Sequence, residues 1–185
     1  MNDVLAFLQT RNSAPKLIEP APSAEEMQAM YKVAMRAPDH AWLHPWRFIA
    51  IAGDRREALG QVLEKCLLLR DPEADENARG KALRAPLRAP LLVAVVVRLS
   101  EHPKVPPVEQ RLSAGCAAHG LLLAAEAMGY AGVWRTGAAA FDRNVMDALG
   151  LSQSEELVGF IYLGTRAGKA KTLPQLSTAE FVSSW

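Results

Sequence analysis

Seven consecutive apolar residues, Leu91 to Val97, constrain the fold more than any other part of this sequence. The segment reads LLVAVVV and follows a proline, Pro90. Because the side chains of a strand point alternately to its two faces, a strand that is apolar at every position must be covered on both sides. The segment therefore predicts a central strand in a sheet that lies between layers of helices.

The rest of the chain alternates between helical and strand patterns. Three helices are predicted in the first part of the chain: 2–10, a helix from the N-cap Ser23 (in a capping box with Glu26) to Arg36, and a helix from the N-cap Asp54 to Leu69. Another helix is predicted between a polar loop at 71–77 and the prolines of 84–90. The last two are 108–128, with Gly129 as its C′ residue, and a helix from the N-cap Asp142 to Gly150. Strands are predicted for 47–52, 131–135 and 156–164, followed by a polar tail from Thr165. The helix at 108–128 is rich in glycine and alanine, so neighbouring backbones are expected to approach it closely.

Length and charge narrow the class of protein. The 185 residues suit one domain, 1–185, with a core of its own. With 21 basic and 20 acidic residues the net charge is +1, which argues against nucleic acid or an anionic membrane surface as partner. The start, Met1-Asn2-Asp3, has no basic leader before an apolar run, so a cytoplasmic location is expected. Small molecules or another protein chain are the expected partners.

The cysteines and histidines do not indicate a metal site or a disulfide framework. Cys66 and Cys116 lie 50 positions apart and are interpreted as small buried hydrophobes. Cys116 and His119 have the spacing of a thiol and its base on one helix, but their small apolar neighbours favour packing over catalysis. His40 and His44 are four apart without a third ligand nearby in the sequence, so no metal is expected.

A glycine-rich stretch, Gly164 to Lys169, looks at first like a phosphate loop. Only three residues separate its glycines and alanine follows the lysine, whereas a P-loop needs four residues and then serine or threonine. No G-x-G-x-x-G motif opens a helix either. The basic residues here are better explained as a solvated tail, and they are Arg166, Lys169 and Lys171.

Three segments combine cationic, polar and aromatic side chains: 11–13, 36–46 and 134–137. The middle one holds an arginine, two histidines and two tryptophans, and it follows a helix end, where arginine and histidine are also favoured by the helix dipole. A functional and a structural role are therefore both open for it. In the last segment, Trp134 and Arg135 end a predicted strand. A planar anionic ligand would explain both, and so would a core tryptophan beside an arginine that reaches solvent.

Together these segments resemble a known family. The stretches RNSAPKLIEPAPS, MRAPDHAWLHPWRF, RAPLRAPLLVAVV, HPKVPPVEQRLSAGCA, GYAGVWRTGA and GFIYLGT, in this order from about Phe7 to about Lys171, are similar to the flavin-dependent nitroreductase family and to its short bacterial branch. The resemblance implies an α+β fold with a mixed, mainly antiparallel central sheet wrapped by helices. It also implies an obligate homodimer with FMN bound at the interface.

The resemblance also carries over site residues. Arg11 and Ser13 match a turn that grips the FMN phosphate, and Asn12 stands between them where relatives often have arginine or histidine. Arg36 and His40 match positions that reach the flavin of the partner subunit. Trp134, Arg135 and Thr136 match the end of a strand that lies beside the flavin ring in relatives. The backbone of that strand end can offer an N–H to flavin N5. A segment with pyridine-nucleotide contacts in relatives is matched by Ala124, Ala125, Glu126, Ala127, Met128 and Gly129.

The implied activity is oxidoreduction by a ping-pong hydride mechanism, in which NAD(P)H reduces the FMN and a nitroaromatic or quinone-like acceptor is then reduced. The flavin carries the chemistry, so no catalytic side chain is expected. Trp42 and Trp46 either line the acceptor pocket or pack in the core. Two alternatives stay open: a flavin enzyme of the same fold with enone reduction, dehydrogenation or dehalogenation as its reaction, and a flavin-binding carrier without catalysis.

Overall fold

The computed structural model describes residues 3–185, so Asn2 of the expected first helix lies outside the described residues. The helices are α1 (Asp3–Gln9), α2 (Ala24–Ala34), α3 (Asp54–Arg70), α4 (Glu76–Arg84), α5 (Pro107–Ala127) and α6 (Arg143–Ala148), and the strands are β1 (Leu17–Ile18), β2 (Trp46–Ala52), β3 (Leu91–Arg98), β4 (Ala131–Arg135) and β5 (Glu155–Arg166). Short 3-10 turns are η1 (His40–Trp42), η2 (Ala85–Arg88), η3 (Ala138–Phe141) and η4 (Thr178–Glu180).

One five-stranded sheet forms the centre of the molecule. β3 pairs with β2 on one side and with β5 on the other, and β5 also pairs with β4 and with β1. Every strand pair within residues 3–185 is antiparallel. The α+β class and the mainly antiparallel sheet wrapped by helices are confirmed.

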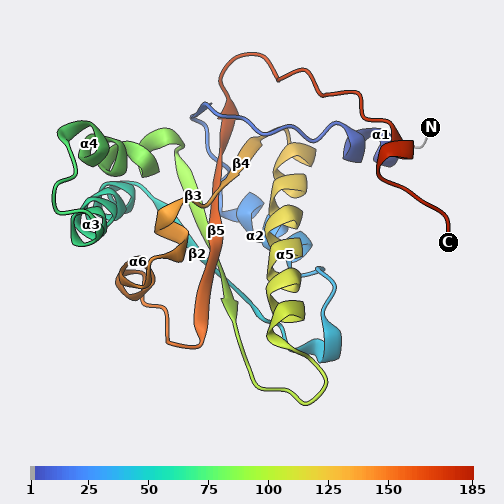
Figure 1. Ribbon diagram of the computed structural model, residues 1–185. Helices are drawn as coiled ribbons and strands as arrows, with labels where there is room; N and C mark the ends of the chain where they lie inside the picture. Colours follow the sequence, from blue (N-terminus) through green and yellow to red (C-terminus); the bar gives the residue numbers. More distant parts are fainter. Residues whose placement is uncertain (1–2) are drawn as a thin grey trace.

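The apolar strand lies where the sequence predicts it. Each residue from Leu91 to Val97 is at most 6% exposed, because helices cover both faces of β3. Its even-numbered side chains pack with α3 and α6, and its odd-numbered side chains pack with α2 and α5. Figure 1 shows these two helical layers on opposite sides of the sheet, with α4 beside α3.

The long helix α5 is approached closely by α2. A Cβ atom at Gly120 would lie 3.2 Å from Ala34 Cα, so a larger residue would push the helices apart. The side of α5 that faces away from the sheet is exposed, with Val108 56% and Leu112 65% accessible. Cys116 lies on this exposed side, so its interpretation as a buried hydrophobe is wrong, whereas Cys66 is buried as expected. Apolar composition alone did not show which side of α5 the chain leaves uncovered.

Most helix boundaries follow their predicted caps. Ser23 and Glu26 form the expected capping box, Gly129 has φ +84° after α5, and Asp142 caps α6. Asp54 is not an N-cap but the first residue of α3, and Gly53 precedes it. Helix α4 begins within 71–77, which was expected to be a loop. Strand β5 extends beyond the expected 156–164 at both ends, and the two-residue strand β1 was not predicted.

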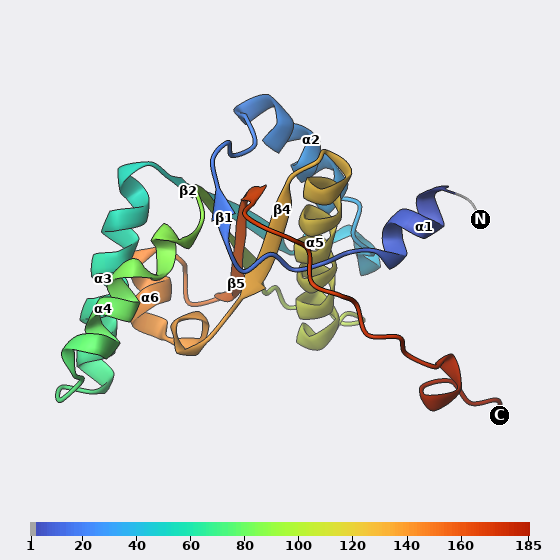
Figure 2. The ribbon, with the colours of Figure 1, turned by 90° about the horizontal axis from the view of Figure 1, so that it is seen from above.

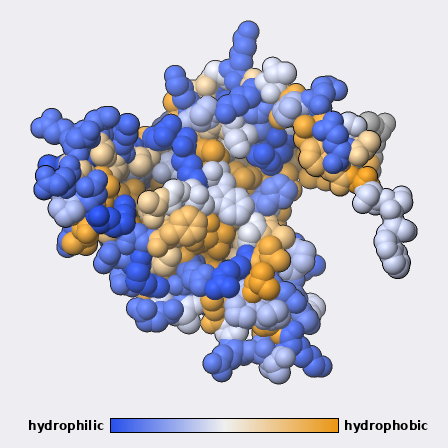
Figure 3. Space-filling view, in the orientation of Figure 1, coloured by the Kyte–Doolittle hydropathy of each residue, from blue (hydrophilic) through white to orange (hydrophobic). Residues whose placement is uncertain are grey.

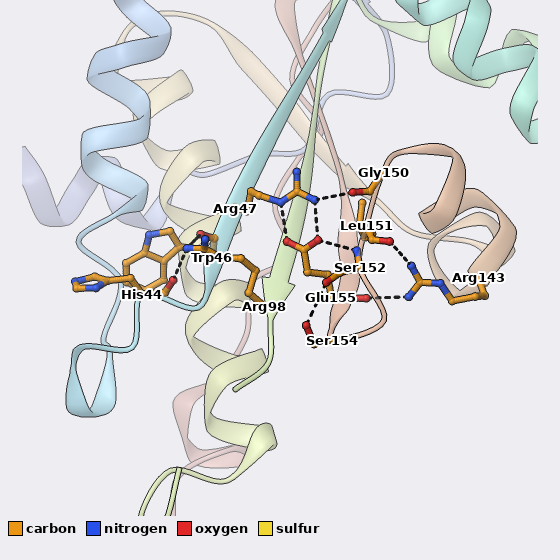
Figure 4. Close-up of polar contacts among 10 residues, drawn as sticks. All are labelled: His44, Trp46, Arg47, Arg98, Arg143, Gly150, Leu151, Ser152, Ser154 and Glu155. Atoms are coloured by element: carbon orange, nitrogen blue, oxygen red, sulfur yellow. Dashed lines mark hydrogen bonds and ion pairs between the residues drawn. The ribbon is translucent and has the colours of Figure 1, made fainter. Parts of the chain in front are cut away.

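A bidentate ion pair joins the beginning of β2 to the beginning of β5 (Figure 4). Arg47 of β2 donates from Nε and Nη2 to the two carboxylate oxygens of Glu155 at 2.7 and 2.9 Å. The Ser152 N–H also donates to Glu155, and Arg143 donates to the backbone carbonyl of Leu151. These contacts hold the loop between α6 and β5 against β2.

Helix α1 and the C-terminal tail project past α5, away from the sheet (Figures 1 and 2). The projecting part, formed by α1 and the tail, carries many apolar side chains (orange at the upper right of Figure 3). Its exposed hydrophobic residues include Val4, Leu5, Leu8, Leu173, Leu176, Phe181 and Val182. No helix within residues 3–185 is long and apolar enough to cross a bilayer.

Candidate functional site

The turn at 11–13 is fixed where α5 and β5 end. The Asn12 N–H donates to Glu126 Oε1 at 2.9 Å, and Arg166 Nη2 donates to the Asn12 carbonyl at 2.7 Å. The Asn12 side chain is turned inward and donates from Nδ2 to the carbonyl of Lys171. Asn12 is 7% exposed. Its side chain therefore ties the turn to the start of the tail.

Arg11 and Ser13 lie next to each other in this turn, on either side of Asn12. Arg11 Nη1 donates to Ser13 Oγ at 3.2 Å, and within residues 3–185 Arg11 makes no ion pair with a carboxylate. The next residue, Ala14, donates its N–H to the carbonyl of Gly132 in β4 at 3.0 Å. A guanidinium and a hydroxyl placed side by side suit an anionic group such as a phosphate. The turn thus offers such a site next to the beginning of β4.

At the other end of β4, Trp134 faces α5. Its indole Nε1 donates to the Val158 carbonyl at 3.4 Å, and its ring reaches Gly115. The contact depends on a β-bulge: Val95 pairs with Gly159 and Val96 with Leu157, which leaves Val158 as the extra residue of β5. A Cβ atom at Gly159 would lie 2.3 Å from Trp134 Nε1, so only glycine leaves room for this indole.

Arg135 faces the other layer. Its Cζ lies 5.5 Å from the centre of the Tyr162 ring, and its Nε is shielded from solvent without a hydrogen-bond partner among the described residues. Burial lowers the pKa of Arg135, and the charge of Arg88 lowers it further. Such a position favours a ligand that accepts hydrogen bonds and carries negative charge.

A cavity of about 420 Å³ opens at this strand end. Its lining includes Arg88, Trp134, Arg135, Thr136, Phe160 and Tyr162. Gly132 and Arg135 are three positions apart in β4, which is about 10 Å at the usual rise of a strand. A phosphate-sized site and an aromatic, cationic cavity therefore lie at the two ends of β4. The sequence indicated both ends, but it gave no signal for Arg88.

Arg36 and His40 lie elsewhere on the same chain. His40 Nδ1 is 2.7 Å from Glu109 Oε2, and Ser113 Oγ donates to the Pro38 carbonyl at 2.7 Å. Both contacts fix the loop to the N-terminal half of α5. Glu126, which holds the turn at 11–13, is seventeen residues beyond Glu109 in α5, or about 25 Å at the usual helical rise. One chain therefore does not bring His40 together with that turn.

The two tryptophans of this loop have different environments. Trp46 is 7% exposed and packs in the core with α2 and α5, whereas Trp42 is 77% exposed. Ala41, Trp42 and His44 have φ values of 61°, 56° and 48°, in the left-handed region. A cavity beside the loop is lined by Arg36, Asp39 and Trp42 among others. Of the two, only Trp42 presents its ring at the surface.

Residues of the segment 124–129 pack in the core and hold the turn at 11–13. Ala124 and Ala125 are buried, and the carboxylate of Glu126 receives the Asn12 N–H and lies 3.7 Å from Arg166. Arg166 is thus part of the site and not of a solvated tail. An acidic residue in the last turn of a helix is unfavourable for the dipole, and this was the signal in the sequence for a partner at Glu126.

Two further sequence hypotheses concern metals and thiols. Within the described part of the chain, no group of three or more His, Cys, Asp or Glu side chains is placed to hold a metal ion. Cys116 and His119 both lie on the exposed side of α5, away from the cavity at the end of β4.

The chain is similar in sequence and in fold to known proteins. A family model described as "Nitroreductase family" matches residues 10–165. The Escherichia coli K12 protein named "Putative NAD(P)H nitroreductase YdjA" is 44% identical over 170 residues, which is 92% of each chain. A nitroreductase-like family protein from Bacillus cereus has a TM-score of 0.84 at 17% identity, over 100% of this chain and 97% of its own. An FMN-bound nitroreductase from Bacteroides fragilis has a TM-score of 0.75 at 22% identity, over 100% of both chains.

Proposed function

The chain belongs to the nitroreductase family, and on that premise we propose that it is an FMN-dependent oxidoreductase that uses NAD(P)H to reduce nitroaromatic or quinone-like acceptors. The relative that is 44% identical is named for NAD(P)H, and a structural neighbour contains FMN. Both properties are transferred to this chain as part of the proposal. The acceptor class follows from the family and from the aromatic lining of the cavity.

One observation carries the proposal: an anion-gripping turn and an aromatic, cationic cavity lie at opposite ends of the same short strand. FMN has a phosphate at one end and a flat ring at the other, joined by a short chain. The shielded Arg135 Nε, which has no partner among residues 3–185, suits the polar edge of such a ring. The residues present therefore fit the group.

The roles of the side chains follow from this arrangement. Arg11 and Ser13 hold the phosphate through charge-assisted hydrogen bonds. Trp134, whose ring packs toward α5, is kept in place by Val158 and Gly159 and fixes the strand end beside the cavity. Arg135 compensates negative charge at the ring edge, and Phe160 and Tyr162 exclude water from the cavity floor. When bound, the flavin supplies the redox chemistry by taking a hydride from NAD(P)H and delivering it to the acceptor in a separate half-reaction. The accessible residues of 124–129 are proposed to meet the nicotinamide cofactor.

The proposed active form is a two-fold homodimer. His40 is held at Glu109, about 25 Å along α5 from Glu126, which fixes the phosphate turn, so Arg36 and His40 of this loop are proposed to serve the flavin of the partner subunit. The exposed side of α5, α1 and the apolar tail provide the hydrophobic surface that such an interface needs. Both flavin sites would then be shared between subunits.

The proposal is tested with the purified protein. We expect a yellow dimer whose flavin absorbance bleaches under anaerobic NADH or NADPH and returns when a nitroaromatic or a quinone is added. Bleaching without reoxidation by either acceptor would indicate a different redox reaction on the same fold. Flavin that neither nicotinamide reduces would indicate a carrier, and a colourless protein in excess FMN would refute the proposal.

A further inference from the structure

The chain contains two arginines in matching local sequences, Arg84-Ala-Pro and Arg88-Ala-Pro. Both are exposed, and Arg84 is the last residue of α4 whereas Arg88 is the last residue of η2. Only Arg88 lines the cavity at the end of β4. The guanidinium of Arg84 lies against the backbone of Gly80 in its own helix, about one turn back. Two residues with the same neighbours thus differ in whether they reach the candidate site.

Arg88 shares the cavity with Arg135, and their charges are not balanced there. No aspartate or glutamate is among the described residues that line this cavity. Both guanidiniums also act on the buried phenol of Tyr162, whose pKa is raised by burial and lowered by Arg135 and Arg88. Two cations that face one partly enclosed space repel each other, and an anion placed between them would relieve that repulsion.

We propose that Arg88 is a second cationic residue of the ring-binding cavity and that, with Arg135, it receives the negative charge of the reduced flavin ring. The proposal rests on the proposed function and names a residue of that same site. The reduced ring carries charge that the oxidised ring lacks, so two cations bind the reduced form more tightly. Arg88 therefore raises the reduction potential of the bound flavin.

The ring, and not the phosphate, is the group expected at Arg88. Phe160 and Tyr162 line the same cavity from the layer that Arg135 faces, and aromatic walls suit a flat ring. The phosphate-gripping side chains, Arg11 and Ser13, lie beside the beginning of β4, about 10 Å from the strand end. The FMN phosphate would have its own cation there.

The test compares Arg88→Ala with Arg84→Ala as the matched control. FMN and riboflavin affinities are measured by fluorescence titration, and the midpoint potential of bound FMN is measured by anaerobic spectroelectrochemistry. We expect Arg88→Ala to weaken binding of reduced relative to oxidised flavin about tenfold, which lowers a two-electron potential by about 30 mV. The Arg84→Ala potential should equal that of the parent protein, and Arg88→Lys should recover part of the loss.

Each other outcome has a defined meaning. If Arg88→Ala does not fold, Arg88→Gln, which keeps most of the side-chain bulk, takes its place with the same expectation. A potential unchanged in a folded, FMN-loaded variant overturns the proposal. If Arg88→Ala binds oxidised and reduced FMN more weakly by the same factor and binds riboflavin as the parent does, the proposal is also overturned, and Arg88 is assigned to the phosphate. A parent protein that binds no FMN refutes the proposed function itself, a result separate from any difference between the arginine variants.

Discussion

Arg135 occupies an unfavourable position for a guanidinium. Burial lowers its pKa, Arg88 adds a like charge, and its Nε has no partner within residues 3–185. The Tyr162 ring at 5.5 Å offsets part of this cost, since a cation over an aromatic face gains about 0.5–2 kcal/mol. The remainder is a local cost that a bound anion would remove, as is common where a site is built for a ligand.

Arg11 gives the most direct test at this scale. Arg11→Ala should weaken FMN binding roughly 10- to 150-fold, because a charge-assisted hydrogen bond contributes about 1.5–3 kcal/mol. Riboflavin, which lacks the phosphate, should bind the variant and the parent equally. Fluorescence titration measures both affinities.

Lys16→Ala is the matched control, because Lys16 is an exposed cation of the same segment and its backbone carbonyl, not its charge, holds Ala167. Its FMN affinity should be unchanged. An FMN affinity of Arg11→Ala equal to that of Lys16→Ala would remove Arg11 from the phosphate site.

Several single residues were predictable from the sequence, and several were not. Ser23, Gly129 and Asp142 have the predicted positions because caps depend on local backbone geometry. The partners of Asn12 are 114 and 159 residues away in the chain, at Glu126 and Lys171, and no local pattern encodes them. Arg88 was missed for the same reason, since only the packing of η2 against α3 brings it to the cavity.

Among the elements, β5 connects the site to the rest of the sheet. Arg166 at its end holds the turn at 11–13, Phe160 and Tyr162 line the cavity, and Glu155 at its start pairs with Arg47. The sequence predicted its apolar centre but not its ends, because Glu155 and Arg166 are charged and belong to β5 through their partners. β1 was missed because two residues carry no periodicity.

The Glu155 pair predicts a pH dependence of stability. Hydrogen bonds from Arg47 lower the pKa of Glu155 despite its burial, so its folded pKa is below its unfolded value of about 4.3. The pair therefore contributes fully above that unfolded value, and its contribution is lost as the pH falls through the folded pKa. Glu155→Gln should lower the free energy of unfolding by about 1.5–3 kcal/mol at pH 7 and by less at pH 3.

Urea unfolding at several pH values measures this difference. Glu180→Gln, in the exposed tail, serves as the control and should match the parent protein throughout. A Glu155→Gln deficit that stays constant from pH 7 to pH 3 would contradict the linkage.

For the whole molecule, the described chain leaves one side incomplete. The exposed side of α5, the helix α1 and the tail all present hydrophobic side chains, while His40 is held away from the turn at 11–13. The sequence indicated a dimer only through family resemblance, since apolar periodicity does not separate an internal surface from one that a partner covers. A second subunit would cover this surface and complete the site.

Leu112 tests that arrangement. It lies on the uncovered side of α5 and is 65% exposed, so Leu112→Glu would place two carboxylates in a two-fold interface. The dimer dissociation constant should rise roughly 100-fold or more, since each buried, unpaired charge costs at least about 1.4 kcal/mol. Sedimentation velocity measures assembly, and absorbance at the flavin band measures FMN retained after gel filtration.

Leu69→Glu provides the control, because Leu69 is 61% exposed on α3, on the other helical layer. That variant should remain dimeric and yellow. A Leu112→Glu protein that stays dimeric with full flavin content would place the interface elsewhere.

The extra residue at Val158 has a consequence for the entire binding region. Before it, odd-numbered side chains such as Leu157 point toward α3 and α6; after it, even-numbered ones such as Phe160 and Tyr162 do so. The alternation of side chains along β5 shifts by one residue at Val158. Because of this shift, Glu155 and Tyr162 point to the same face of the sheet although one is odd-numbered and the other even-numbered. If β5 kept all its residues but paired without this bulge, the alternation would be unbroken and one half of the strand would turn its side chains to the opposite face. The cavity floor and the Arg47 clamp would then be mutually exclusive in one strand.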